Sequence, residues 1–257
     1  MRPAPPGPPL RLFHPADRGF PPAEITVMRF PAAILLLLLA ALTGCRAMPA
    51  PLKLEPVKTD AIIAKAAAHD LVPVGKYDPS IRQDLRYSTT SNVFGRVLYP
   101  AGFPALATGP TAKKLAAANR ALKPHGLRIL VLDAYRPPEV QWQLFQMFRD
   151  DKFVADPRKK WSKHCYGCAV DITLTDLSGQ EAAMPSTFDD FSKKAAARYT
   201  GTDPAIRRRI TLLQKAMTDA GFSLYEDEWW HFNDLTRPAL LNGPPTHGAT
   251  IGLPSSN

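Results

Sequence analysis

The two most informative stretches of this chain are SKHCYGCAVD at residues 162–171 and EWWH at residues 228–231. They contain four side chains of the kinds that serve metal sites, namely His164, Asp171, Glu228 and His231. A catalytic zinc ion typically takes three protein ligands and leaves its fourth position open for water. Two imidazoles and one carboxylate would supply that set, and Glu228, three residues before His231, is a candidate to take the proton of the water. The pattern predicts a zinc site with its own base.

The flanking sequence predicts short strands and separate helices. Strands are expected at residues 128–133, within the apolar run 127–132, and at residues 169–174 and 230–233. Helices are expected at residues 111–122, from Pro137 or Pro138 to about residue 148, and at residues 204–220, after Asp203 or Thr202 as a cap. This mixture indicates an α+β fold.

The two stretches resemble a known family. The patterns Ser-x-His-x-x-Gly-x-Ala-x-Asp and Glu-x-Trp-His are similar to those of zinc D,D-peptidases that cut peptidoglycan-derived peptides. Three further segments resemble the D-alanyl-D-alanine dipeptidase branch: DLRY at 84–87 with NVFG at 92–95, LDAYRP at 132–137, and MPSTFD at 184–189. The resemblance runs from about residue 71 to residue 235.

The resemblance implies both a fold and a set of roles. The implied fold is a small, mainly antiparallel sheet flanked by helices, with zinc on its concave face. One Zn²⁺ per chain would be bound by His164, Asp171 and His231. The remaining implied roles are general acid/base for Glu228, transition-state stabilisation for Arg136, ammonium binding for Asp189, and lining of the substrate pocket for Ser162 and Tyr87.

Arg136 and Asp189 each have a plainer interpretation. Arg136 follows an apolar run and precedes two prolines, so its guanidinium can point into a cleft and stabilise an oxyanion, or it can pair with Asp133. Asp189 precedes a polar segment at residues 193–198 and can cap a helix there. As a ligand for a free ammonium group it would instead favour very short substrates.

Three cysteines are present. Cys45 follows Leu42-Thr43-Gly44, a sequence that resembles a bacterial lipobox. Cys165 and Cys168 stand inside the zinc stretch, where the family pattern does not require cysteine. They can form a disulfide, remain as two buried thiols, or take a metal role; four-cysteine zinc coordination is excluded because too few thiols remain.

Composition divides the chain into four parts. Residues 1–44 contain an upstream extension and a signal-like apolar run after Met28-Arg29, which is shorter than the roughly 20 residues that span a bilayer. Translation from Met28 would explain the extension. Residues 45–56 read as a lipid-anchored tether, 57–244 as the catalytic domain and 245–257 as a disordered tail. The expected location is the bacterial cell envelope, facing the periplasm, with attachment to the membrane through the lipid anchor.

The net charge is +9. Such a surplus suits work beside anionic envelope polymers, although a merely solvated surface is the simpler and preferred explanation. The basic clusters lack interleaved aromatic residues and any nucleic-acid motif, so no nucleic-acid partner is expected. The expected function is hydrolysis of D-Ala-D-Ala or related short D-amino-acid peptides. The alternatives are a D,D- or L,D-carboxypeptidase acting on longer peptidoglycan stems, and a non-catalytic zinc-containing module that binds the envelope.

Overall fold

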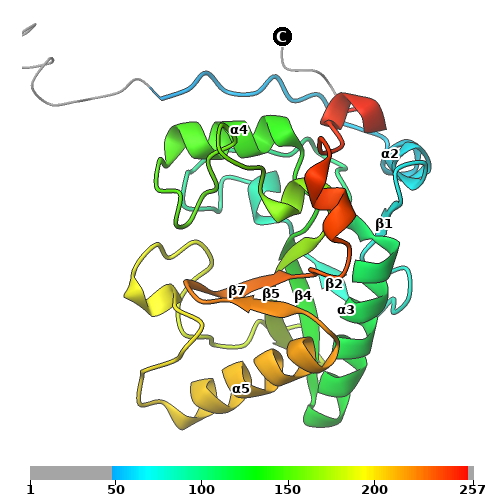
Figure 1. The fold of residues 1–257 in the computed structure, drawn as a ribbon. Helices are drawn as coiled ribbons and strands as arrows, with labels where there is room; N and C mark the ends of the chain where they lie inside the picture. The colour runs from blue at the N-terminus through cyan, green and yellow to red at the C-terminus, as the bar shows by residue number, and fades with distance from the viewer. Residues whose placement is uncertain (1–47, 254–257) are drawn as a thin grey trace, which may run out of the picture. The chain divides into compact units, whose positions relative to one another are not determined.

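The computed structural model describes residues 48–253, in which a five-stranded sheet forms the centre (Figure 1). Its strand order is β2-β4-β5-β7-β6. The strands are β2 (Arg82–Gln83), β4 (Leu127–Asp133), β5 (Ala169–Asp176), β7 (Glu228–Asn233) and β6 (Ser223–Tyr225). β5 pairs antiparallel with β4 and β7, and β6 pairs antiparallel with β7. The prediction of an α+β fold with a mainly antiparallel sheet is confirmed.

One edge of the sheet departs from that pattern, because β2 runs parallel to β4. With two residues, β2 is too short to show an alternation of apolar and polar residues. A separate two-stranded sheet pairs β1 (Leu71–Pro73) with β3 (Leu106–Thr108). It supports the loop after β4, since the Tyr135 amide donates to the Leu106 carbonyl at 2.7 Å.

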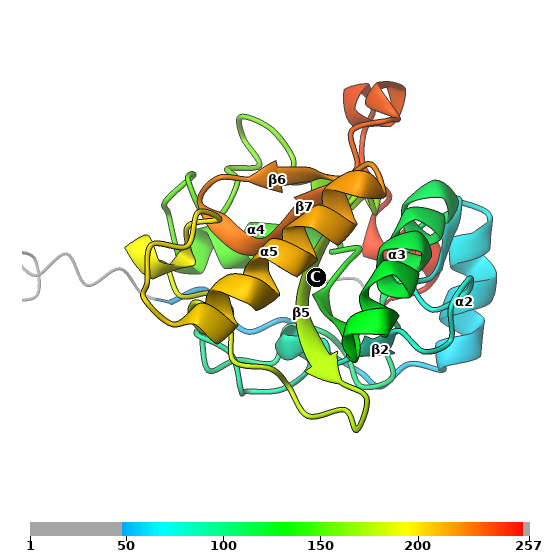
Figure 2. The ribbon, with the colours of Figure 1, turned by 90° about the horizontal axis from the view of Figure 1, so that it is seen from below.

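Helices lie on both sides of the sheet. The described residues contain α2 (Thr59–Ala67), α3 (Gly109–Leu122), α4 (Pro138–Met147) and α5 (Pro204–Asp219). Figures 1 and 2 show α5 and α4 on opposite sides of the sheet, with α3 beside α5. Cover on both faces explains why β4 and β5 are buried along most of their length, including the polar residues of β5. No helix in the described part of the chain is long and apolar enough to span a membrane.

The predicted helix boundaries are correct to within two residues. Asp203 caps α5, because its side chain accepts hydrogen bonds from the amides of Ala205 and Ile206 at 2.7 and 3.1 Å. Thr108 caps α3 in the same way through the Thr111 amide. α4 begins at Pro138, where a missing N–H costs nothing. α2, which the sequence analysis did not predict, is short and precedes β1.

The chain ends depart from the expected tether and tail. The upstream extension, the signal-like run and Cys45 lie outside the described residues. Within the expected tether, Pro49 and Ala50 contact the domain: their carbonyls accept hydrogen bonds from Arg96 and Gln143 at 2.6 and 2.7 Å. The prediction of a disordered tail is wrong for residues 245–253, because they contain a short helix (Gly248–Ile251) whose Ile251 is fully buried.

Candidate active site

The three predicted metal ligands meet at the N-terminal end of β5. Asp171 on β5 lies directly opposite His231 on β7 in the strand register. His164 comes from a tight 3₁₀ turn (Lys163–Tyr166) that precedes β5. This turn ends at Gly167 with φ +65°, where a Cβ atom would lie 2.5 Å from the Leu71 side chain. Glycine is therefore needed to bring His164 back over the sheet.

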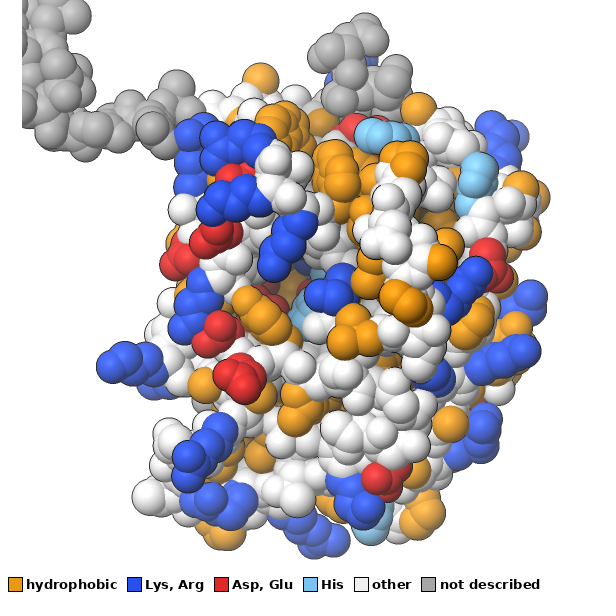
Figure 3. All heavy atoms as spheres, in the orientation of Figure 1, with side chains coloured by type: hydrophobic (Ala, Val, Ile, Leu, Met, Phe, Trp, Pro, Cys, Tyr) orange, Lys and Arg blue, Asp and Glu red, His pale blue; other side chains and the backbone are white. Residues whose placement is uncertain are grey.

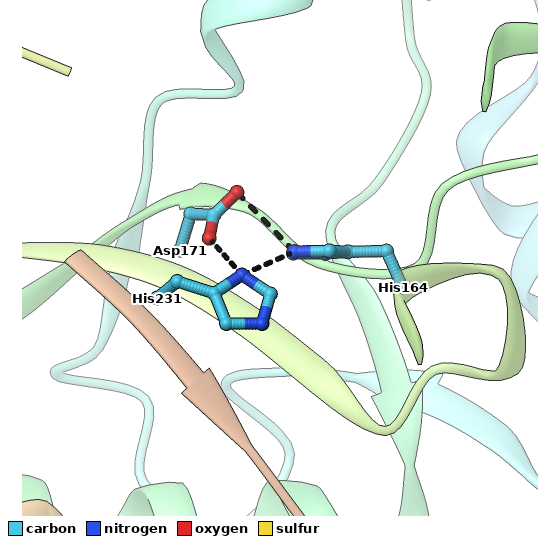
Figure 4. Close-up of side chains that lie close together, drawn as sticks. All are labelled: His164, Asp171 and His231. Carbon is cyan, nitrogen blue, oxygen red and sulfur yellow. Dashed lines mark hydrogen bonds and ion pairs between the residues drawn. The ribbon is translucent and has the colours of Figure 1, made fainter. Parts of the chain in front are cut away.

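Their potential ligand atoms converge (Figure 4). Nδ1 of His231 lies 3.1 Å from Nε2 of His164 and 3.0 Å from Oδ1 of Asp171. Nε2 of His164 lies 3.3 Å from Oδ2 of Asp171. One ligand atom from each residue falls within 4.8 Å of the others. His164 and Asp171 are almost completely buried.

Hydrogen bonds on the far side of each ring determine which nitrogen faces the centre. Nδ1 of His164 is 2.7 Å from the Ala134 carbonyl, which can only accept, so Nδ1 carries the proton and Nε2 offers a lone pair. Nε2 of His231 is 2.9 Å from Oδ1 of Asn233, which assigns the proton to Nε2 and the lone pair to Nδ1. Two neutral imidazoles and one carboxylate with such supporting contacts fit a divalent metal ion.

The pKa values of Asp171 and Glu228 are shifted in opposite directions. Although burial acts in the opposite direction, His164 and His231 hold the pKa of Asp171 well below its usual value, through their hydrogen bonds and, when the rings are protonated in the absence of a metal, through positive charge. Burial, followed by the negative charges of Asp171 and Asp189, raises the pKa of Glu228 well above its usual value. Oε2 of Glu228 is 3.6 Å from Nδ1 of His231. Glu228 thus lies beside the ligand set as a group suited to proton transfer.

Arg136 makes the ion pair with Asp133 and also faces the site. Nε and Nη2 of Arg136 lie 2.9 and 2.7 Å from Oδ2 of Asp133, while Nη1 donates to Oε1 of Gln141 at 2.7 Å. Nη2 is 3.7 Å from Oδ2 of Asp171. One N–H on each terminal nitrogen is left for another acceptor. The two interpretations of Arg136 are therefore compatible, because the ion pair fixes the guanidinium beside the metal ligands.

Asp189 is buried in the same pocket and caps no helix. The nearby 3₁₀ turn (Lys193–Ala195) is capped by Ser192, so the capping interpretation is wrong. Asp189 has φ +58°, an uncommon conformation for a residue with a side chain. Its Oδ2 accepts a hydrogen bond from the Tyr87 hydroxyl at 2.9 Å. Burial, followed by the charge of Asp171, raises the pKa of Asp189 to about 8, and the hydrogen bond from Tyr87 and the charge of Arg136 only partly offset this rise.

All the predicted catalytic, metal-binding and substrate-binding residues line one cavity of about 100 Å³, and Ser162 is among them. In Figure 3 a hollow near the middle of this face shows histidine atoms, with basic side chains around it. Ser162 also accepts a hydrogen bond from the His164 amide at 3.3 Å. Four residues of the pocket region carry no pattern that the sequence analysis used: Gln141, Lys163, Tyr225 and Asn233. The Tyr225 hydroxyl, for example, donates to the Lys152 carbonyl, a contact across residues far apart in the chain.

The two cysteines of the zinc stretch are free thiols in the described structure, and both are buried. Burial raises the pKa of Cys165 to about 12 and that of Cys168 to about 11. Neither belongs to the metal-binding group found among the described residues. The disulfide hypothesis is therefore wrong for this structure, and the metal role has no support. Protonated, buried thiols act as small apolar side chains.

A group of two histidines and one aspartate, next to an acid of raised pKa, defines a candidate metallohydrolase centre. Residues 67–244 match the family model of the peptidase family M15, described as D-ala-D-ala dipeptidase. The D-alanyl-D-alanine dipeptidase of Escherichia coli (strain K12) is 32% identical over 166 residues, covering 63% of this chain and 83% of that protein. That of Enterococcus faecalis is 25% identical over 179 residues, covering 62% and 88%. The chain belongs to the D-Ala-D-Ala dipeptidase family and is a peptidase.

Proposed function

We propose that this protein is a zinc-dependent dipeptidase that hydrolyses D-Ala-D-Ala. The observation that carries the proposal is the convergence of His164, Asp171 and His231 beside Glu228. A zinc ion held by those three residues would activate a water molecule and polarise the scissile carbonyl. Membership of the dipeptidase family supports the substrate.

The proposed roles of the protein's own groups follow from their positions. Glu228 takes the proton of the attacking water and passes it to the leaving amine, a task suited to a carboxylate whose pKa burial and the neighbouring acids raise above its usual value. Arg136, fixed by Asp133 and Gln141, donates its remaining N–H groups to the oxygen that becomes negatively charged. Because its donors are already oriented, little reorganisation is needed during the reaction.

Asp189 selects short substrates in this proposal. The ammonium group of a free dipeptide lies one residue from the scissile carbonyl and can approach the buried carboxylate, whose ionised form it stabilises. An N-acylated or longer peptide has no charge at that point and leaves Asp189 without its partner. Because the pKa of Asp189 is about 8, its carboxyl stays mostly protonated beside such a peptide at neutral pH, so the peptide lacks the ion pair that favours binding of the free dipeptide. The Tyr87 hydroxyl and Ser162 complete the wall of the pocket.

The proposed location is the bacterial cell envelope. Its support is the signal-like run that ends at Cys45, whose thiol would carry a lipid and attach the protein to the membrane. At that location the enzyme would meet short D-amino-acid peptides derived from the cell wall.

The proposal is tested by measuring kcat/KM for D-Ala-D-Ala and N-acetyl-D-Ala-D-Ala with zinc-loaded, chelator-treated and zinc-restored protein. We expect hydrolysis of the free dipeptide only, its loss with the chelator and its return with zinc. Glu228→Gln should retain zinc and lose about 10²- to 10⁴-fold in kcat. Asp189→Asn should reduce the ratio of kcat/KM for D-Ala-D-Ala to kcat/KM for N-acetyl-D-Ala-D-Ala.

Each other result has a definite meaning. Equal cleavage of the acetylated peptide by the wild type would favour the carboxypeptidase alternative. Full activity of Glu228→Gln would show that another group is the base. Binding of zinc without hydrolysis of either peptide would favour the envelope-binding module.

A further inference from the structure

The described chain begins with a segment that is held on the domain beside α4. Arg96 donates a hydrogen bond to the Pro49 carbonyl at 2.6 Å. Gln143, which is on α4, donates to the Ala50 carbonyl at 2.7 Å, and Leu52 packs against the hydrophobic core. Figure 1 shows this segment running past α4. From Pro49 onward, therefore, the segment is fixed to the domain and does not act as a free linker.

This attachment places the domain close to the proposed lipid. Cys45 precedes Met48 by three residues, and a fully extended chain of three residues spans about 11 Å at most. A lipid on Cys45 would therefore keep the start of the held segment near the surface of the bilayer. The part of the domain that holds this segment would lie near the bilayer as well.

Exposed hydrophobic side chains gather around the same segment. In the described part of the chain eight large hydrophobic side chains are exposed. Three of them, Met48 at 52%, Val97 at 39% and Trp142 at 39%, are each next in sequence to a residue that makes one of the two hydrogen bonds holding the segment. They come from three distant parts of the sequence, so the fold brings them to one region.

Trp142 also borders an apolar depression of about 340 Å³. Its other walls are two prolines, Glu139, Trp161 and His247. Glu139 is already engaged, because it accepts hydrogen bonds from Nδ1 of His247 and from the Gly248 amide, both at 3.2 Å. Within residues 48–253 neither Trp142 nor Trp161 has an acceptor for its indole N–H. An apolar ring with a free N–H is typical of side chains at the headgroup level of a membrane.

The charges near this region are positive. Lys53 belongs to the held segment, Arg96 binds it, and Arg149 follows α4. Among the described residues none of these three forms a salt bridge with a carboxylate. Basic side chains close to a membrane are attracted to anionic lipid headgroups. The charge therefore favours an anionic bilayer as the partner of the hydrophobic side chains.

We propose that the α4 surface, defined by Met48, Val97, Trp142 and Trp161, contacts an anionic phospholipid bilayer at the level of its headgroups. The inference rests on the proposed lipid attachment at Cys45 and goes beyond it, because it fixes which face of the domain meets the membrane. Trp161 lines both the apolar depression and the catalytic cavity. The cavity would thus open beside the bilayer and take up its substrate at the membrane surface.

The test uses the full lipidated protein, loaded with zinc and reconstituted in vesicles of phosphatidylethanolamine and phosphatidylglycerol. A fluorescent probe is attached to Val97→Cys or, as the control, to Leu177→Cys. Leu177 is more exposed than Val97, at 52%, and follows the end of β5 opposite to the metal ligands. Both native thiols of the described chain are buried, which protects them from the label. Lipids brominated near the headgroup quench a probe that lies at the bilayer surface.

We expect the brominated lipids to lower the fluorescence of the Val97 probe about twofold and to leave the Leu177 probe nearly unchanged. Trp142→Ala, made in the Val97→Cys protein, should remove about half of the quenching or more, because an aromatic contact with the headgroups is lost. Replacing phosphatidylglycerol by phosphatidylcholine should reduce it as well. Intact mass gives the state of Cys45, and hydrolysis of D-Ala-D-Ala is measured on the same preparations.

Equal quenching of the two probes would overturn the inference. So would quenching of the Val97 probe that neither Trp142→Ala nor the neutral lipid reduces, since the short distance to the anchor would then explain it. In both cases a lipidated Cys45 would leave the proposed anchor intact. An unmodified Cys45 would instead overturn the anchor and this inference with it, whereas the hydrolysis assay tests the dipeptidase function separately.

Discussion

At the scale of single residues, the orientation of the metal ligands depends on contacts outside the ligand set. His164 is oriented by the main-chain carbonyl of Ala134, and a substitution of the Ala134 side chain would leave that carbonyl in place. His231 is oriented by the side chain of Asn233, which is buried next to the cavity. Contacts of this kind fix the tautomer and the direction of the lone pair. The Asn233 side chain is therefore the contact that a substitution can remove without changing a metal ligand.

We predict that Asn233→Ala weakens zinc binding about 10- to 100-fold, because Nε2 of His231 loses its acceptor and the ring is no longer held. Asn233→Asp keeps an oxygen at the same place and should bind zinc at least as tightly as the wild type. The measurement is competition for zinc with a chromophoric chelator. Wild-type affinity in Asn233→Ala would show that strand pairing alone orients His231.

At the scale of elements, α4 connects Arg136 with the loop that covers the cavity. Gln141 on α4 accepts from Nη1 of Arg136 at 2.7 Å and donates from Nε2 to the Ala155 carbonyl at 2.8 Å. Its side chain is completely buried. The Tyr99 hydroxyl and the Ala134 amide hold the other partner of Arg136, Asp133, at 2.5 and 2.9 Å. The guanidinium is thus held by residues from three parts of the chain.

Gln141→Leu should lower kcat about tenfold or more with a smaller change in KM. The reason is that Arg136, no longer held in place, loses more of its interaction with the transition state than with the bound substrate. Stability should fall by about 1–3 kcal/mol, since buried polar groups lose their partner. Gln143→Leu is the matched control: Gln143 is on the same helix, is buried and donates to the Ala50 carbonyl, away from the site. An equal loss of kcat in both variants would mean that the effect comes from general destabilisation.

At the scale of the whole domain, the C-terminal segment packs against the first described helix, α2. Residues 248–251 pack against α2, and the Leu253 side chain contacts the core. The Tyr135 hydroxyl donates to the Thr246 carbonyl at 2.5 Å, and the Gly248 amide donates to Glu139 at 3.2 Å. The tail therefore contributes to the fold and touches the residue before Arg136.

Ile251→Ala should lower the free energy of unfolding by about 2–5 kcal/mol, because it leaves a cavity between the tail and α2. Leu253→Ala, at a half-buried position on the same segment, should cost less. Thermal or urea unfolding of zinc-loaded protein measures both. If Ile251→Ala and the wild type unfolded at the same temperature and urea concentration, the tail would add no stability.

The sequence by itself indicated which three residues could hold a metal ion, the main strands, and three helices with the cap of one of them, Asp203. These features depend on residues close together in the chain: a cap bonds to amides two or three positions away, and a buried strand shows as an apolar run. The parallel pairing of β2, the free state of Cys165 and Cys168 and the ordered tail depend on the tertiary structure. So do the contacts of Gln141, Tyr225 and Asn233 around the site. Each is decided by which distant surfaces pack together and exclude water, and local sequence patterns do not encode that choice.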